Sequence, residues 1–356
     1  MLFILSERGN LNVPKIKRES RELLQGGNLA VKILSHGDTD GICSAALAKA
    51  RFPNAEVWFT RPITLLRDLN TIDIGNVVFI LDIAISETHK EEIFKRIREL
   101  AQKDEVVYID HHPLPPNTLK RDIPATQFAH EIGTSASEIT FRLFESDINP
   151  DLDRVALWGA IADYCEETEF VRDGMSKYDR RTIYMEAGLL TQALGEAAGD
   201  YHYKREVVLK LARGDPPTEI PEIFERAMKA TKREWEVWRY VKEHVIREGN
   251  IAILYDLPSG SLGKAALYAL GTTGANVGIC TRKDDDEIDV SIRRRAGAKI
   301  DLNEMLRHIT ARLGGSGGGH EGAAGATVPA NLFDAFLDTV KKEISPVISR
   351  NFTLKR

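Results

Sequence analysis

Short apolar runs alternate with helix-like segments through the first half of the chain. Nearly continuous runs of strand length cover residues 29–34, 77–83 and 106–109. They are rich in β-branched residues, and such runs are typical of strands buried on both faces of a parallel sheet. Because helix-like segments separate them, the pattern predicts an α/β fold with a doubly wound parallel sheet. A further strand is predicted at residues 56–60, and helices are predicted at residues 14–26, 42–50, 63–69, 87–102, 136–144 and 153–161.

A long helical stretch opens the second half. Residues 175–248 keep a helical pattern that is broken at the GDPP sequence of residues 214–217, and this stretch is interpreted as a connector. Trp235 and Trp238 lie on the apolar stripe of its last helix, so they are expected in the core rather than in a base-stacking platform. A second, smaller α/β unit follows. Its strands are predicted at residues 251–255, 277–281 and 288–293, and its helices at residues 262–270 and 302–313.

Composition and charge narrow the functional classes. The chain has 356 residues and a formal net charge of -5, so any nucleic-acid binding must come from local basic patches. No apolar run reaches the roughly 18 residues of a membrane-spanning helix. The apolar residues 1–5 stop at a charged segment and lack the pattern of a signal peptide, which predicts a cytoplasmic protein. The three cysteines form no CxxC pair, which argues against a zinc ribbon or a disulfide framework.

Candidate metal ligands follow the first predicted strand. His36, Asp38 and Asp40 alternate within SHGDTDG, and in extended backbone residues two apart point the same way. Carboxylates this close repel each other unless a cation lies between them. An alternative is that both aspartates are turn and N-cap residues, and for this motif alone the two interpretations have similar weight.

Two further strand ends favour the metal interpretation. The run at residues 77–83 reaches an acid at Asp82, and the run at residues 106–109 ends in Asp110, His111 and His112. Asp163 follows the helix predicted at residues 153–161. Ligands bind at the carboxyl ends of strands in open α/β sheets, so the sequence predicts a metal site there.

A glycine-rich segment marks the second unit. Residues 314–326 read GGSGGGHEGAAGA and include His320. Closely spaced glycines allow backbone N–H groups to surround an anion, which favours a phosphate-binding loop over the alternative of a flexible linker.

Taken together, SHGDTDG, Asp82 in ILDIA, Asp110-His111-His112, Asp163 in GAIADY and GGSGGGH resemble the DHH phosphoesterase superfamily with its DHHA1 C-terminal domain. Within the superfamily, the form of the first motif is similar to that of the archaeal RecJ-like exonucleases. The resemblance implies a DHH catalytic domain at residues 1–175, a helical connector at 176–248 and a DHHA1 substrate-binding domain at 249–356. It also implies an active site in the cleft between the two domains.

The resemblance further implies two divalent ions, Mn²⁺ or Mg²⁺. One would bind His36, Asp38 and Asp82. The other would bind Asp40, Asp82, His111 and Asp163. Some relatives carry this first histidine at another spacing or an aspartate in its place, so ligation by His36 stays open. His112 would act on a phosphate oxygen or the leaving group, and Asp110 would orient a histidine.

In the second domain the resemblance implies phosphate binding by a serine-x-arginine strand and a glycine-histidine loop. The matching residues are Ser291, Arg293, Gly317, Gly318, Gly319 and His320. Arg294 and Arg295 would extend a basic patch along a nucleic-acid strand, although a solvated face explains these two equally well.

The expected function is therefore a manganese-dependent hydrolase, an exonuclease on single-stranded DNA or RNA. A 3′ to 5′ direction, a role in DNA replication or repair, and a helicase or replisome partner are expected from the resemblance alone. One alternative is a phosphodiesterase for short oligoribonucleotides or cyclic dinucleotides. Another is a replisome scaffold that has lost catalysis, although every ligand position here holds a competent residue.

Overall fold

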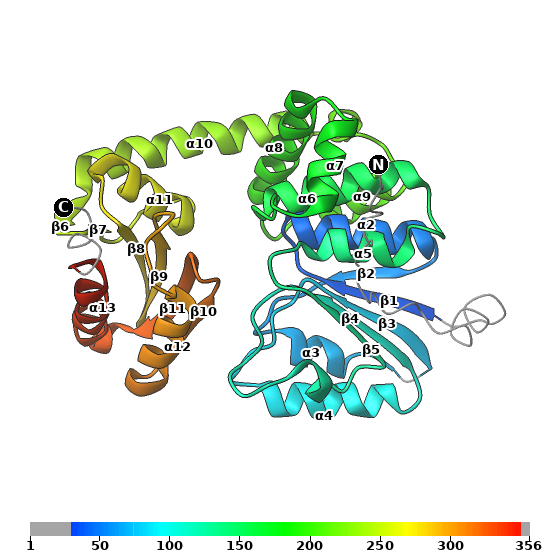
Figure 1. Cartoon of the computed structure of the whole chain (residues 1–356), viewed down its shortest axis with the longest axis horizontal. Coiled ribbons are helices and arrows are strands. Elements are labelled where there is room, and N and C mark those ends of the chain that lie inside the picture. Colours follow the sequence, from blue (N-terminus) through cyan, green and yellow to red (C-terminus); the bar gives the residue numbers. More distant parts are fainter. Residues whose placement is uncertain (1–29, 74, 350–356) are drawn as a thin grey trace, which may run out of the picture. The chain divides into compact units, whose positions relative to one another are not determined.

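A sheet of parallel strands forms the centre of the first part of the chain in the computed structural model, which describes residues 30–73 and 75–349 (Figure 1). The strand order is β2-β1-β3-β4-β5, so the chain reverses its direction of winding between β1 and β3. The bounds are β1 (Ala30–Ser35), β2 (Glu56–Phe59), β3 (Asn76–Leu81), β4 (Glu105–Asp110) and β5 (Gln127–His130). The helix predicted at residues 14–26 lies outside the described residues.

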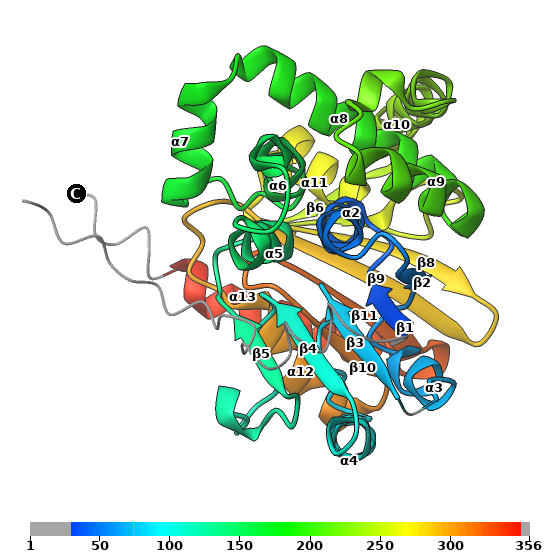
Figure 2. The ribbon, with the colours of Figure 1, turned by 90° about the vertical axis from the view of Figure 1, so that its right-hand side faces the viewer.

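Helices cover both faces of this sheet, as Figures 1 and 2 show. On one face Ile33, Phe79 and Val107 pack in a core with α2 and its neighbours, and on the other face Leu34 and Ile80 pack with α3 and α4. Successive strand residues thus alternate between two cores, and the prediction of a doubly wound sheet is confirmed. The helices are α2 (Thr39–Arg51), α3 (Leu65–Asn70), α4 (Lys90–Ala101), α5 (Ala136–Phe144) and α6 (Asp153–Ala162).

The helical stretch after residue 168 contributes to two compact units, which divide after Met228. Buried residues of α8 and α9 belong to the core of the first unit, whereas Val237 and Val241 of α10 pack in the second. Trp235 is 57% exposed, so the expectation that it lies in the core is wrong. It lies two residues before Val237, about 200° around the helix from that buried side chain. The helices are α7 (Glu169–Lys177), α8 (Arg180–Ala197), α9 (Tyr201–Ala212) and α10 (Ile223–His244).

The second unit is built on a mixed sheet with the order β10-β11-β9-β8-β7-β6. Among these described strands, only β7 and β8 pair in parallel. Helices α12 and α13 pack on one face around Ile279, and α11 packs on the other around Cys280. The strands are β6 (Ile246–Glu248), β7 (Ile251–Leu254), β8 (Val277–Asp284), β9 (Glu287–Arg294), β10 (Ser316–Gly319) and β11 (Ala323–Pro329). The helices are α11 (Leu262–Thr273), α12 (Leu302–Leu313) and α13 (Phe333–Ser349).

Part of the glycine-rich segment is a strand and not the predicted loop. The glycines of β10 pair with β11, and residues 320–322 form the tight connection between the two strands. A Cβ atom on Gly317 would lie 3.0 Å from Thr310 and 3.3 Å from Leu306, and one on Gly318 would lie 3.3 Å from Asn303. The glycines therefore allow α12 to pack closely on this edge of the sheet.

Within the described residues, every helix is too short or too polar to cross a lipid bilayer.

Candidate metal centre

Imidazole and carboxylate side chains gather at the carboxyl edge of the parallel sheet. Most of them follow β1, β3 and β4, next to the point between β1 and β3 where open α/β sheets bind ligands, and Asp163 follows α6. Three groups have donor atoms within 4.8 Å of one another, namely His36 with Asp38 and Asp82, Asp82 with His111 and His112, and His111 with Asp163 and Cys165. Six of the predicted residues are thus brought together in overlapping groups, and Asp40 joins them through His111.

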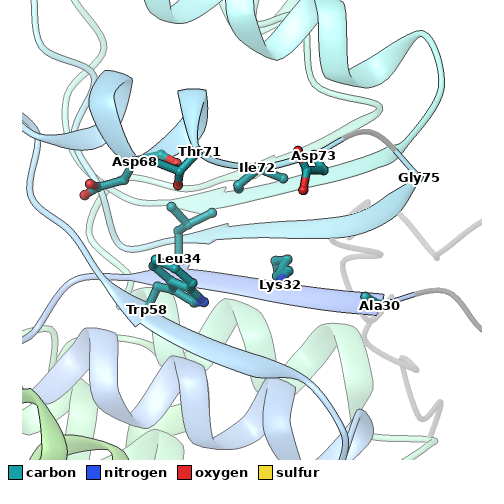
Figure 3. Close-up of a pocket in the computed structure, with 9 residues that line it drawn as sticks. All are labelled: Ala30, Lys32, Leu34, Trp58, Asp68, Thr71, Ile72, Asp73 and Gly75. Carbon is teal, nitrogen blue, oxygen red and sulfur yellow. The ribbon is translucent and has the colours of Figure 1, made fainter.

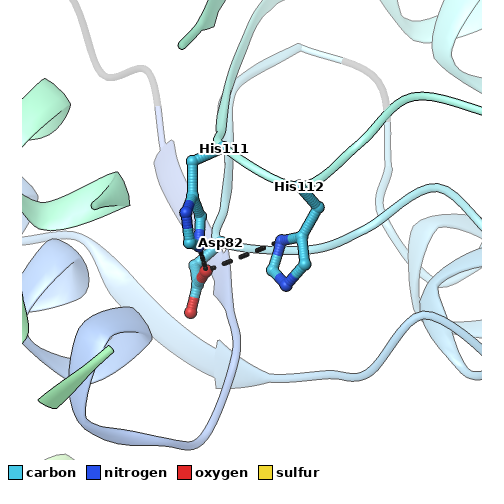
Figure 4. Close-up of side chains that lie close together, drawn as sticks. All are labelled: Asp82, His111 and His112. Atoms are coloured by element: carbon cyan, nitrogen blue, oxygen red, sulfur yellow. Dashed lines mark ion pairs between the residues drawn. The ribbon is translucent and has the colours of Figure 1, made fainter. Parts of the chain in front are cut away.

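Asp82 and His111 lie at the centre of the cluster (Figure 4). The Nε2 atom of His111 is 3.3 Å from Oδ1 of Asp82 and 3.2 Å from Oδ2 of Asp163. It is also 3.9 Å from Oδ2 of Asp40. The Nδ1 atom of His112 is 3.9 Å from Oδ1 of Asp82. One imidazole therefore faces three carboxylates that come from three different elements.

The first motif supplies the other side of the cluster. The Nδ1 atom of His36 is 2.8 Å from Oδ2 of Asp38 and 3.8 Å from Oδ2 of Asp82. Oδ1 of Asp38 accepts a hydrogen bond from the amide of Gly41 and caps α2. The N-cap interpretation of Asp38 is thus confirmed, and its second oxygen still faces the cluster.

Asp40 is held by the start of another helix. Its Oδ2 atom accepts a hydrogen bond from the Ala136 amide (2.7 Å), and its Oδ1 atom accepts one from the Ser137 amide (3.0 Å). These amides begin α5, where N–H groups lack partners within the helix and favour a negative charge. The contact fixes the Asp40 carboxylate, and no local pattern indicates it because the partners lie 96 and 97 residues away.

The backbone of Asp82 is strained. Its φ angle is +58°, in the left-handed region that costs non-glycine residues on the order of 1–3 kcal/mol, although aspartate tolerates it better than most. Its side chain is almost fully buried, and its Oδ2 atom accepts no hydrogen bond from the described residues. A buried carboxylate oxygen in this state is suited to a cation.

The electrostatics of the cluster also favour binding of a cation. Burial, together with the charges of Asp38, Asp40 and other neighbouring carboxylates, raises the pKa of Asp82 well above its usual range. Burial and the charge of Asp40 raise the pKa of Asp163 to about 7. Burial lowers the pKa of His111, but a hydrogen bond with Cys165 and the carboxylates of Asp40 and Asp163 outweigh it and raise that pKa to about 10. The cluster thus retains protons that a divalent ion can replace, and its mixed imidazole and carboxylate donors suit Mn²⁺.

Two neighbouring residues, Asp110 and His130, hold His112 in its orientation. Its Nδ1 atom lies 2.8 Å from Oδ1 of the buried Asp110, and its carbonyl oxygen is 2.7 Å from Nε2 of His130. Asp110 therefore fixes the ring of His112, in keeping with the expectation that it orients a histidine.

In the second unit, the structure brings Ser291 and Arg293 together on β9. Nη1 of Arg293 donates to Oγ of Ser291 (3.0 Å) and to the carbonyl of Ile292 (2.9 Å). Gly263, in the first turn of α11, leaves room for the guanidinium, since a Cβ atom there would lie 3.2 Å from its Cζ atom. Arg294 points to the opposite face of the strand, where it forms an ion pair with Glu321 and its side chain is only 15% exposed, so it does not lie on a solvated face.

The remaining predicted phosphate-binding residues lie on β10 and at its end. Gly325 of β11 pairs with Gly318 of β10 on one side and with Ser291 of β9 on the other. Gly318 and Ser291 therefore lie about 10 Å apart across the sheet. The amide of Gly319 donates to Oδ1 of Asn303 (3.0 Å), and the amide of His320 donates to the carbonyl of Ala323. These two amides are thus engaged within the unit.

Sequence reasoning missed two residues at the metal centre. Cys165 adds a thiol beside Asp163. Its position two residues after Asp163 in the sequence is the signal that indicates it. Lys204 of α9 is 5% exposed and donates from Nζ to the carbonyl of Gly37 (2.6 Å), which ties α9 to the first motif. The lysine is 167 residues from its partner, so nothing in the local sequence signals this contact.

A separate cavity of about 250 Å³ lies between β1, β2 and the end of α3 (Figure 3). Leu34, Trp58 and Ile72 give it an apolar lining, and Asp68 and Asp73 add carboxylates. It contains none of the predicted site residues.

Two family models match the chain. The DHH family N-terminal domain matches residues 30–164, and the DHHA1 domain matches residues 248–345. The chain belongs to the DHH/DHHA1 superfamily, and its first unit has the fold of DHH-family phosphoesterases.

Individual relatives are distant. An uncharacterized protein of Methanocaldococcus jannaschii is 26% identical over 278 residues, which are 77% of this chain and 48% of that protein. The chain thus spans about half the length of this curated relative. RecJ of Thermus thermophilus in complex with Mn²⁺ superimposes with a TM-score of 0.65 and 18% identity, over 92% of this chain and 54% of that chain. The pGpG-specific phosphodiesterase PggH of Vibrio cholerae superimposes with a TM-score of 0.55 and 14% identity, over 88% and 99% respectively. At these identities the structural matches show the fold.

Proposed function

We propose that this chain is a metal-dependent phosphodiesterase that removes nucleotides from the end of single-stranded DNA or RNA. The observation that carries the proposal is the cluster at the β1/β3 edge, where Asp82 and His111 are shared between overlapping groups of candidate ligands. The RecJ match and the form of the SHGDTDG motif support the archaeal RecJ-like branch.

We assign the metal ligands as the resemblance implies. His36, Asp38 and Asp82 hold one divalent ion, and Asp40, Asp82, His111 and Asp163 hold the other. Mn²⁺ or Mg²⁺ held by these residues would supply the chemistry that activates a water molecule and neutralises charge on the leaving oxygen. The helix start at α5 holds Asp40, and Asp110 holds the ring of His112. His112 then donates a hydrogen bond to a phosphate oxygen or a proton to the leaving group.

The second unit binds the phosphate groups of the substrate in this proposal. The guanidinium of Arg293 binds phosphate oxygens, and Ser291 holds this guanidinium in place. Gly317, Gly318, Gly319 and His320 contribute from the β10 edge. We further propose 3′ to 5′ cutting, a cytoplasmic role in DNA replication or repair, and a helicase or replisome partner.

A second candidate is a phosphodiesterase for dinucleotides, short oligoribonucleotides or cyclic dinucleotides. The match to PggH supports it, because this chain superimposes on 99% of that protein with a TM-score of 0.55. Substrate length therefore separates the two candidates.

The test is a degradation ladder on 5′-labelled and 3′-labelled single-stranded DNA and RNA, from dinucleotides to about 30-mers, with Mn²⁺ or EDTA. Asp82→Asn is the control, since asparagine keeps the size of the side chain and tolerates the left-handed backbone. We expect a Mn²⁺-dependent ladder on long strands that this variant lacks. Cleavage of dinucleotides alone would establish the second candidate, and no cleavage of any substrate by the natural chain would contradict both.

A further inference from the structure

Cys165 places a sulfur atom beside two of the assigned metal ligands. Its Sγ atom is 4.0 Å from Oδ2 of Asp163, and this oxygen is 3.2 Å from Nε2 of His111. All three donor atoms lie within 4.8 Å of one another. The thiol is half-buried, whereas Cys43 in α2 and Cys280 in β8 are buried. The described residues thus offer a nitrogen, an oxygen and a sulfur donor around one point.

A strained turn at the end of α6 places the Cys165 thiol beside Asp163. Helix α6 ends at Asp163, and the amide of Cys165 then reaches back to the carbonyl of Ala160 (2.8 Å) while that of Tyr164 reaches Ile161 (3.2 Å). This Schellman turn requires a left-handed residue after the helix, a position that favours glycine. Tyr164 occupies it with a φ of +59°. The turn brings Cys165 back beside Asp163, although the left-handed backbone of Tyr164 is unfavourable for a residue other than glycine.

We propose that His111, Asp163 and Cys165 form a binding site for a soft ion of the zinc class, Zn²⁺ or Cd²⁺. Tetrahedral bond lengths to sulfur, nitrogen and oxygen place such donors about 3.3–3.6 Å apart. The His111 to Asp163 distance of 3.2 Å already fits, whereas the sulfur, at 4.0 Å from the Asp163 oxygen and within 4.8 Å of the His111 nitrogen, must move closer to both. Water or a phosphate oxygen completes the fourth position. The thiol proton passes to solvent as the ion binds.

A zinc-class ion bound at this site inhibits the catalytic centre. This inference rests on the proposed function. His111 and Asp163 are assigned to one catalytic Mn²⁺, so a soft ion on these residues excludes it. Zn²⁺ binds nitrogen and sulfur donors more tightly than Mn²⁺ does, and thiolate widens the difference because it is a soft ligand. We therefore expect Zn²⁺ to displace Mn²⁺ and to inhibit the protein.

The test is a titration of the full chain with Cd²⁺, followed by the ultraviolet charge-transfer absorption of a cadmium-thiolate bond. We expect the band in the natural chain and in the control Cys280→Ser, whose cysteine is buried in the second unit. Cys165→Ser should lack the band, and its Zn²⁺ affinity against a chromophoric chelator should fall at least about 10-fold, since loss of even an outer-shell partner of a ligand costs about 10- to 100-fold. Its Mn²⁺ affinity by electron paramagnetic resonance should stay the same.

A band that persists in Cys165→Ser, or an unchanged Zn²⁺ affinity, would overturn the site. Cys165→Ala and circular dichroism of both variants separate loss of the ligand from loss of the fold. The absorption band does not depend on nucleic-acid cleavage. Its absence would therefore refute the zinc-class site without bearing on the proposed phosphodiesterase activity.

Discussion

Protons and metal ions compete for the same side chains at the edge of the parallel sheet. The pKa of Asp163 is raised from 3.8 to about 7, so the proton it holds stabilises the metal-free fold at acid pH, and this stability is lost as the pH rises through that range. The pKa of His111 is raised from 6.5 to about 10, and its contribution is likewise lost as the pH rises from 6.5 to about 10. Both groups therefore make the metal-free protein less stable at higher pH.

We predict that stabilisation by Mn²⁺ grows with pH. At about pH 5.5 protons occupy the ligands, whereas at about pH 8.5 the ion relieves carboxylates that repel each other. The measurement is the melting temperature with EDTA and with saturating Mn²⁺ at both pH values. The shift caused by Mn²⁺ should be larger at the higher pH, and Asp163→Asn should reduce this difference. A shift that is equal at both pH values would show that these residues do not bind the ion.

At the scale of elements, three helices pack around the carboxylate of Asp40. It lies in the first turn of α2, it accepts hydrogen bonds from the start of α5, and it contacts α6 at Gly159. A Cβ atom on Gly159 would lie 2.7 Å from Oδ1 of Asp40 and 2.8 Å from the Cβ atom of Ser137. The glycine therefore allows α6 to approach a candidate ligand, and the packing of the helices fixes the ligand's position.

We predict that Gly159→Ala destabilises the protein by about 1–3 kcal/mol, because an overpacked core must shift. It should also weaken Mn²⁺ binding, since Asp40 moves with the helices. The matched control is Gly188→Ala in α8, where a Cβ atom meets nothing within 4 Å. That change should stabilise the helix by about 0.5–1 kcal/mol. Denaturant unfolding and Mn²⁺ titration measure both effects, and similar results for the two variants would contradict the packing argument.

The same elements show how far the sequence determines the structure. Strands β3 and β4 were predictable because they are buried on both faces and appear as apolar runs, and their ends locate Asp82 and His111. Strand β10 was not, since a run of glycines has no side-chain pattern to distinguish a strand from a loop. The contacts of Asp40 with α5 join residues about 96 positions apart, which no local pattern encodes.

At the scale of the whole molecule, the two kinds of chemistry lie in different units. All the candidate metal ligands belong to the first unit, whereas Arg293 and its partner Ser291 belong to the second. Substitutions in the second unit should therefore change substrate binding and leave metal binding intact. This separation allows the two roles to be measured independently.

We predict that Arg293→Ala raises KM for a single-stranded oligonucleotide and largely preserves kcat. Hydrogen bonds to a charged group contribute about 1.5–3 kcal/mol, which corresponds to about 10- to 150-fold in affinity. The control is Arg294→Ala, because Arg294 carries the same charge on the same strand but faces the other way and pairs with Glu321. Its KM should stay close to that of the natural chain.

Mn²⁺ affinity and melting temperature check that Arg293→Ala keeps its fold, since Arg293 also bonds to the carbonyl of Ile292. Equal increases of KM in both variants would mean that the substrate responds only to the net charge of the second unit. An unchanged KM in Arg293→Ala would remove the guanidinium from the phosphate site. A selective rise in KM with unchanged Mn²⁺ affinity would assign phosphate binding to the second unit and metal binding to the first.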